Sequence, residues 1–301
     1  MDFTYMMLLF VKGWNLNGTP VAGNNGMGPN LYQLNGAYGL FVDEDGVVYV
    51  ADSLNYRIVK WKPNALFGEL VAGGNGSGNA SNQLTEVADV VVDKNGTMYI
   101  TDLRNRRVQQ WHQGAQSGET IIRNIMANGI AQDDEGSLYV SEWTDGKVRK
   151  WRKGQTIGED IITDLITAER LFVDQNRTVY VADQYGNCVK KKAVGEKKDS
   201  LVAGGSDGYA GAGANQLNSP TSVLVDKLGN VYVTDTANHR VMCWPLGARS
   251  GTLIVGGNGP GERPNQLNRP LDLAFDKDEN LYVLDRENQR VQKFFVKNTE
   301  N

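Results

Sequence analysis

Four side chains with oxygen donors recur at neighbouring positions of a repeating pattern and could bind a metal ion together. Asp89 and Asp272 lie four residues before an aspartate that ends a short apolar run, and Asn128 and Glu169 lie five residues before the same aspartate in other copies. Carboxylate and amide oxygens are the ligands that Ca²⁺ prefers in proteins. If the copies are arranged around an axis, these oxygens could converge on it.

Arg170 leaves a second interpretation of these residues open. It takes, in its own copy, the position that Asp89 and Asp272 take in theirs. A guanidinium at this position could neutralise both aspartates and form a salt-bridged channel mouth without a metal. The sequence therefore favours an ion-pair network and keeps a Ca²⁺ site as the alternative.

Histidine and cysteine chemistry is poorly represented. The two histidines, His112 and His239, fall at different points of the repeat, so they should point to different faces. A catalytic zinc site with three histidine ligands is therefore excluded. The two cysteines, Cys188 and Cys243, lie in different repeats and predict neither a disulfide framework nor a zinc site.

Aromatic and basic side chains fall in several predicted loops and could contact a binding partner. Arg104, Trp143 and Tyr185 are the examples that we select as contact residues. Arginine and aromatic residues dominate recognition sites in general, and they can also stack on nucleic-acid bases. The net charge of −4 favours a protein, peptide or glycan ligand over RNA.

The pattern Asp-x-x-Asn-x-Arg identifies the elements that must position these residues. It begins at Asp52, Asp102, Asp235 and Asp285, and weaker copies begin at Glu142 and Asp183. The copies define six units of roughly 40 to 50 residues, a period typical of propeller blades. Because the pattern returns in most units, we interpret its Asp and Arg as a structural link that holds a loop, and not as a catalytic pair.

One unit predicts a blade of four short antiparallel strands. In residues 71–120, a short strand at 71–74 precedes a polar loop, and the apolar run at 87–93 is typical of a strand buried on both faces. Asn95-Gly96 predicts a tight hairpin turn, and two more strands follow. The fold class is therefore all-β, a six-bladed β-propeller whose blades pack radially.

The chain ends predict how the ring closes. Residues 19–23 read as a strand without a blade of their own, and the last repeat lacks its outer strand. We expect this N-terminal strand to complete the last blade. The predicted boundaries are 1–14 for an N-terminal extension (a truncated leader or an extra strand), 15–296 for the propeller and 297–301 for a polar tail.

No apolar run approaches the length of a membrane span, and the N-terminus lacks the features of a complete signal peptide. The sequence leaves both a secreted and a cytoplasmic location open. We expect a monomer.

The quoted repeats resemble the NHL repeat over residues 15–296. The matching segments are YVADSLNYRIVKW, YITDLRNRRVQQW, YVTDTANHRVMCW and YVLDRENQRVQKF. The resemblance implies a six-bladed propeller whose loop faces bind proteins, RNA or small molecules. Propellers similar to these include amidating lyases and calcium-dependent lactonases, but fold does not carry function with it.

The function predicted from the sequence is a non-catalytic module that binds a ligand or protein through its loop face and channel mouth. The contact residues are Asp89, Arg104, Trp143, Arg170, Tyr185 and Asp272. One alternative is a calcium-dependent hydrolase or lactonase with Asp89, Asn128, Glu169 and Asp272 as ligands. RNA binding is the other. No cofactor is expected except Ca²⁺ in the first alternative.

Overall fold

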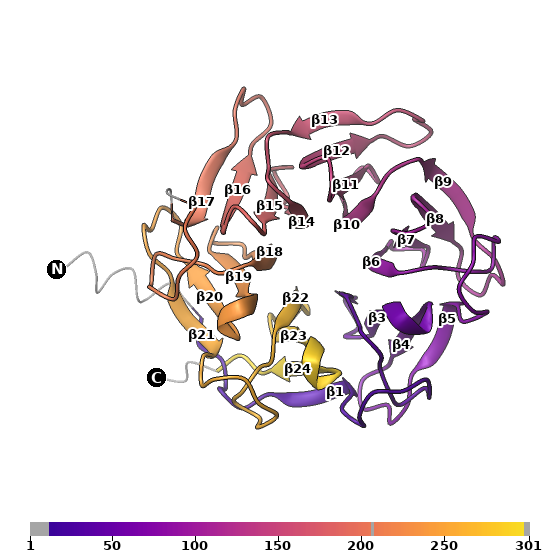
Figure 1. The fold of residues 1–301 in the computed structure, drawn as a ribbon, viewed down its shortest axis with the longest axis horizontal. Helices are drawn as coiled ribbons and strands as arrows, with labels where there is room; N and C mark the ends of the chain where they lie inside the picture. The colour runs from indigo at the N-terminus through magenta and orange to yellow at the C-terminus, as the bar shows by residue number, and fades with distance from the viewer. Residues whose placement is uncertain (1–11, 206–207, 298–301) are drawn as a thin grey trace.

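The computed structural model describes residues 12–205 and 208–297, and these form six antiparallel sheets of four strands each, arranged in a ring (Figure 1). Each sheet is one blade, with its first strand nearest the axis. The predicted six-bladed β-propeller is confirmed. Residues 1–11 of the predicted extension and 298–301 of the predicted tail lie outside the described residues. No helix in the described part of the chain has the length and apolar character needed to cross a membrane.

The blades follow one another along the chain. Blade 1 contains β2 (Gly39–Val42), β3 (Val48–Asp52), β4 (Arg57–Trp61) and β5 (Glu69–Gly73). Blade 2 contains β6 (Val87–Val92), β7 (Met98–Asp102), β8 (Arg107–Trp111) and β9 (Glu119–Arg123). Blade 3 contains β10 (Ala127–Gln132), β11 (Leu138–Glu142), β12 (Lys147–Trp151) and β13 (Glu159–Ile162). Blade 4 contains β14 (Ala168–Val173), β15 (Val179–Asp183), β16 (Cys188–Lys192) and β17 (Ser200–Gly204).

Blade 5 contains β18 (Pro220–Val225), β19 (Val231–Asp235), β20 (Arg240–Trp244) and β21 (Thr252–Gly256). Blade 6 contains β22 (Pro270–Phe275), β23 (Leu281–Asp285), β24 (Arg290–Phe294) and β1 (Thr19–Gly23). Short 3₁₀ helices connect the second and third strands of three blades: η1 (Ser53–Asn55), η2 (Thr236–Asn238) and η3 (Arg286–Asn288).

Each blade has two ends, which are named here by their connections. The turn end carries the tight turn between the first and second strands, for example Asp93–Thr97. There the Oδ1 atom of Asp93 accepts the backbone N–H groups of Asn95 and Thr97, each at 2.9 Å. The loop end carries the connection between the second and third strands. Since first strands run from the loop end to the turn end, every inner strand has the same direction along the axis.

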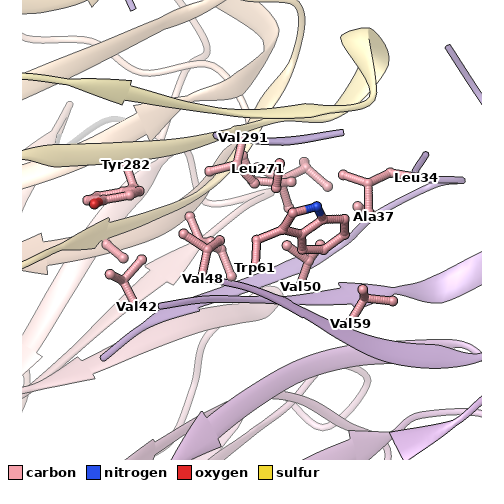
Figure 2. Packing of buried hydrophobic residues seen from close by; sticks show 14 residues of the cluster. Leu34, Ala37, Val42, Val48, Val50, Val59, Trp61, Leu271, Tyr282 and Val291 are labelled. Atoms are coloured by element: carbon pink, nitrogen blue, oxygen red, sulfur yellow. The ribbon is translucent and has the colours of Figure 1, made fainter. Parts of the chain in front are cut away.

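The apolar core lies between adjacent blades. Between blades 6 and 1, Trp61 and Val50 are buried in one cluster with Leu271 and Val291 (Figure 2). Comparable clusters fill the spaces between the other blades. This packing explains the apolar residues in the second half of most first strands, such as residues 90–92 and 171–173, since both faces of these strands contact a neighbouring blade.

The N-terminal strand closes the ring as predicted. β1 pairs antiparallel with β24, with Thr19 opposite Lys293 and Gly23 opposite Arg290. The pairing continues beyond β1, where Trp14 forms an isolated bridge with Val296. The contacts that join the two ends of the chain therefore include residues before position 15.

The repeated Asp and Arg form a structural clamp on the long loop that enters the blade. In blade 2, the Oδ2 atom of Asp102 accepts the Nε–H of Arg107 at 2.8 Å, and Oδ1 accepts the N–H of Thr85 at 2.8 Å. The remaining Arg107 nitrogens donate to the carbonyls of Asn79 at 2.9 Å and Gln83 at 2.8 Å. Blades 1, 5 and 6 repeat the ion pair as Asp52–Arg57, Asp235–Arg240 and Asp285–Arg290.

Blades 3 and 4 lack this long loop, and their clamps differ accordingly. In blade 3, Glu142 pairs with Arg149 at 2.9 Å. In blade 4, Asp183 accepts the N–H of Thr167 at 2.9 Å, and Cys188 replaces the arginine. The arginine of the repeat is therefore present in the blades where loop carbonyls need its donors.

Candidate functional site

The third residue of each inner strand, or its equivalent, lies close to the axis near the loop end. Blades 2, 4, 5 and 6 place Asp89, Arg170, Ser222 and Asp272 there. The inner strands are sheet edges, so their free backbone N–H and C=O groups also face the axis. The predicted channel mouth is thus built from four side chains and a ring of backbone polar groups.

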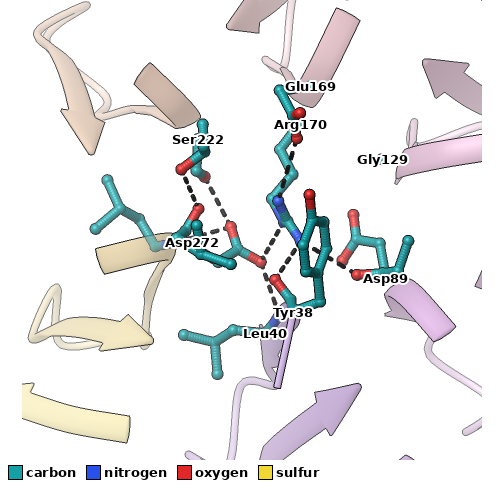
Figure 3. A network of polar contacts seen from close by, with 12 residues as sticks. Tyr38, Leu40, Asp89, Gly129, Glu169, Arg170, Ser222 and Asp272 are labelled. Atoms are coloured by element: carbon teal, nitrogen blue, oxygen red, sulfur yellow. Dashed lines mark hydrogen bonds and ion pairs between the residues drawn. The ribbon is translucent and has the colours of Figure 1, made fainter. Parts of the chain in front are cut away.

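Arg170 crosses the axis and connects four blades (Figure 3). Its Nε atom lies 3.1 Å from the Oδ2 atom of Asp272 in blade 6. Its Nη2 atom donates to the carbonyl of Tyr38, just before β2, and to the carbonyl of Ala88 in blade 2, the latter at 3.2 Å. The guanidinium also lies over the ring of Tyr38, 4.7 Å from its centroid.

Asp272 is fully engaged by its neighbours. Its Oδ2 atom accepts the backbone N–H of Leu40 in blade 1 at 2.7 Å. Its Oδ1 atom accepts the hydroxyl of Ser222 in blade 5 at 2.7 Å and the N–H of Leu273 at 2.9 Å. Together with the Arg170 contact, these bonds connect Asp272 to the blades on both sides.

Asp89 makes the same kind of link between blades 2 and 3. Its Oδ2 atom accepts the N–H of Ile130 at 3.0 Å, and its Oδ1 atom accepts the N–H of Val90 at 2.9 Å. Asp89 and Asp272 therefore both close a gap between inner strand edges by accepting a backbone donor from the next blade.

Glu169 and Asn128 lie beside this network and contact each other between blades 3 and 4. The Nδ2 atom of Asn128 donates to the Oε2 atom of Glu169 at 2.7 Å, and Oε2 lies 3.7 Å from the Nη1 atom of Arg170. The Oε1 atom of Glu169 is buried and has no hydrogen-bond partner among the described residues. Within residues 12–205 and 208–297, no group of three or more His, Cys, Asp or Glu side chains has an arrangement suited to a metal ion.

A central cavity of about 550 Å³ extends from the network to the turn end. Asp89, Arg170, Ser222 and Asp272 form its floor, and apolar side chains of the six inner strands contribute its walls. Its rim contains charged residues of the turns: Asp174, Asp226, Lys227, Asp276, Lys277 and Glu279. Asn128 and Glu169, two of the predicted Ca²⁺ ligands, do not line it.

Burial dominates the electrostatics of the floor. It raises the pKa of Asp89 to about 7, and the nearby negative charge of Asp272 adds to this effect, while Arg170 opposes it. Burial also raises the pKa of Asp272 and of Glu169, and again Arg170 opposes the rise. One guanidinium is therefore shared among three buried carboxyl groups.

The raised pKa of Asp89 predicts how stability changes with pH. The folded protein retains a proton on Asp89 that the unfolded chain has released, so this group's contribution is fully present below its usual pKa of 3.8 and is lost as pH rises through about 7. We expect Asp89→Asn to remove this part of the decline in unfolding free energy. Urea titrations of the wild-type protein and the variant at a series of pH values measure the unfolding free energy. An equal dependence of this free energy on pH in both proteins would contradict the prediction.

The other selected contact residues lie at the loop end, outside the cavity. Arg104 and Tyr185 are exposed and Trp143 is half-buried. Arg104 forms an ion pair with Glu86, so its positive charge already has a partner within the protein. The six residues selected from the sequence thus divide into a buried group of three at the axis and a separate group of three on the loops.

Ser222, whose hydroxyl donates to Asp272, and three further contributors to the floor were not selected from the sequence. Tyr38 stacks on Arg170, and the backbone donors of Leu40 and Ile130 hold the two aspartates. The position of Tyr38, directly before the inner-strand residues, is a signal that could have identified it. Backbone donors carry no such signal, because every residue except proline has one.

Sequence comparison identifies part of the repeat directly. The family model of the NHL repeat matches residues 217–244 and 267–294, which belong to blades 5 and 6. No curated protein matches the sequence.

Solved structures with the same architecture include binding proteins and enzymes. An auxiliary nutrient binding protein from Bacteroides thetaiotaomicron has a TM-score of 0.73 and 17% identity, over 95% of this chain and 78% of that chain. A gluconolactonase from Xanthomonas campestris has a TM-score of 0.67 and 10% identity, over 93% and 98% of the two chains. A virginiamycin B lyase from Staphylococcus aureus has a TM-score of 0.61 and 9% identity, over 87% and 95%. At these identities the similarity shows the fold alone.

Proposed function

Since the chain is a six-bladed β-propeller that carries NHL repeats, we propose that it is a non-catalytic binding module that takes a small organic ligand into its central channel. The observation that carries this proposal is the cavity of about 550 Å³ with apolar walls and a charged floor. Ligand sites in proteins have volumes of this order and combine apolar walls with a few convergent polar groups. The description of a structurally similar protein as nutrient binding supports a role of this kind.

The charges of the cavity favour a ligand that is cationic or rich in hydroxyl groups. Asp89 and Asp272 share the single guanidinium of Arg170 at the floor. At the rim, Asp276 and Glu279 are paired with Lys293 and Lys12, which leaves Asp174 and Asp226 beside Lys227 and Lys277. An anionic ligand would therefore meet unfavourable charge at the floor.

The test compares small probes of different charge. Choline, its uncharged analogue with carbon in place of nitrogen, glucose and succinate are titrated into the protein, and binding is followed by ligand-observed NMR. We expect choline or glucose to bind, and succinate not to bind.

A narrowed cavity supplies the control. Gln132 ends β10 and lines the cavity, so Gln132→Trp should abolish binding. Gln113→Trp introduces the same side chain at an exposed position outside the cavity and should leave binding unchanged. The proposal fails if no cationic or hydroxyl-rich probe binds, or if binding survives Gln132→Trp.

A calcium-dependent hydrolase is the second candidate. The observation that favours it is the buried Oε1 atom of Glu169, which has no hydrogen-bond partner among the described residues and lies beside Asn128. Arg170 counts against it, because the guanidinium already compensates the negative charge that would attract Ca²⁺.

The calcium proposal makes a simple thermal prediction. A metal that binds only the folded protein stabilises it by about 2.7 kcal/mol at a hundredfold excess over its dissociation constant. If the site exists, Ca²⁺ should raise the melting temperature of EDTA-treated protein, and Glu169→Gln should reduce the rise. An unchanged melting temperature would count against the hydrolase and leave the binding module as proposed.

A further inference from the structure

The outer part of the space between blades forms a groove that Trp14 fills at one place in the ring. Trp14 is 3% exposed and belongs to the buried cluster between blades 5 and 6. Its ring stacks on Phe275 at 6.0 Å between centroids and meets Tyr232 edge-on at 5.5 Å. Its Nε1–H donates to the carbonyl of Glu279 at 3.1 Å.

The groove between blades 4 and 5 is built from the equivalent positions. Around Trp14 the relevant positions are Tyr232, Cys243, Ile254, Glu279, Leu281 and Phe294. One blade earlier in the ring, the repeat places Tyr180, Lys191, Val202, Gly229, Val231 and Trp244 at these positions, and all six line a cavity of about 520 Å³. The counterpart of Phe275, the ring on which Trp14 stacks, is Val225, which does not line this cavity. The groove that Trp14 fills between blades 5 and 6 is therefore open between blades 4 and 5.

The open groove differs from the filled one in charge. Lys191 stands where the filled groove has Cys243, and Arg249 lies on the same rim. No aspartate or glutamate lines this cavity, and neither cation has an ion-pair partner among the described residues.

The corresponding groove between blades 6 and 1 provides a contrast. Its lysine, Lys293, pairs with Asp276 at 2.8 Å and lies over the ring of Tyr282. Glu44, Asp45 and Asp278 also line that cavity. Of these three grooves, therefore, only the one between blades 4 and 5 combines aromatic side chains, Tyr180 and Trp244, with lysine and arginine side chains that have no ion-pair partner among the described residues.

We propose that the groove between blades 4 and 5 binds an extended segment of a partner protein through an aromatic side chain with an acidic residue beside it. The aromatic ring takes the place that Trp14 takes one groove further on and packs against Tyr180 and Trp244. The acidic group contacts Lys191 and Arg249. Aromatic anchors in fully packed pockets supply much of the affinity of protein interfaces. This site is separate from the central channel, so it does not depend on the proposed function.

The probe is a short peptide with the sequence Asp-Trp-Asp, blocked at both ends and carrying fluorine on the indole. Its ¹⁹F resonance reports binding without interference from the tryptophans of the protein. We expect the resonance to shift and broaden with wild-type protein, and a peptide with fluorophenylalanine in place of the tryptophan to bind more weakly. A peptide with Asn in place of both Asp residues should also bind more weakly.

Matched charge reversals locate the site. Lys191→Glu should weaken binding of the acidic peptide by about tenfold or more, because attraction becomes repulsion in a partly buried groove. Lys197→Glu makes the same change at an exposed position outside the cavity and should have little effect. The proposal is overturned if the acidic peptide does not bind, if the Asn peptide binds equally well, or if both variants behave alike.

Discussion

Trp14→Ala is expected to lower the free energy of unfolding by about 3–5 kcal/mol, the range for removing a large aromatic side chain from a core. Trp14 is buried, stacks on Phe275 and donates a hydrogen bond to the turn of blade 6. It also lies in the segment that joins the two chain ends, through its bridge with Val296. Its loss should therefore leave a cavity between blades 5 and 6 and also weaken the contacts that close the ring.

Urea unfolding followed by circular dichroism measures this effect. Leu16→Ala is the matched control, because Leu16 lies in the same segment and is 59% exposed. Substitutions at such surface positions usually change stability by less than about 0.5 kcal/mol. Trp14→Phe should recover part of the loss, since it retains an aromatic ring but not the N–H donor. A cost below about 1 kcal/mol for Trp14→Ala would contradict the role in closure.

The closing strand could be predicted from the sequence, but the role of Trp14 could not. Residues 19–23 repeat the pattern of the other outer strands, so their place in blade 6 follows from the pattern. Trp14 has no counterpart in the repeat, because in the other blades the third and fourth strands are joined by a continuous loop. Its position depends on the broken loop of blade 6, which becomes evident only when both chain ends are placed in space.

The residues near the axis could be located from the sequence, but their contacts could not. The repeat places Asp89, Arg170 and Asp272 at equivalent positions, and the structure brings them to the floor of one cavity. The long side chain of Arg170 reaches three other blades, and no spacing along the chain specifies which carbonyls it meets. Spacing along the chain also placed Arg104 and Tyr185 on loops, but it could not show that these loops lie outside the central cavity.

Arg170→Met is expected to cost about 3–5 kcal/mol, because removing one partner of a buried ion pair leaves the other charge uncompensated. Arg170 is 2% exposed and lies among Asp89, Glu169 and Asp272, which are themselves buried. Methionine retains much of the side-chain volume but loses the positive charge and the donors to the carbonyls of Tyr38 and Ala88. The floor of the channel should lose its link between blades 4, 1, 2 and 6.

The cost of Arg170→Met should also depend on pH in a direction that a packing defect would not produce. Arg170 lowers the pKa values of the three carboxyl groups against the effect of burial. In the folded variant these carboxyl groups should therefore stay protonated to higher pH. Folding of the variant then becomes less favourable as pH rises, and through Asp89 the cost should grow as pH rises above about 7, where the folded wild-type protein loses this proton.

Two further variants separate charge from packing. Adding Asp272→Asn to Arg170→Met should restore part of the stability, since it removes a charge that the first change leaves unpaired. Arg152→Met, at an exposed ion pair with Glu159, should change stability by less than about 0.5 kcal/mol at every pH. Equal costs for Arg170→Met at low and high pH, without recovery in the double variant, would mean that Arg170 acts by filling space. In that case the buried carboxyl groups would be neutral in the folded protein and would need no counter-ion. A cationic ligand in the channel would then have to be bound by other residues.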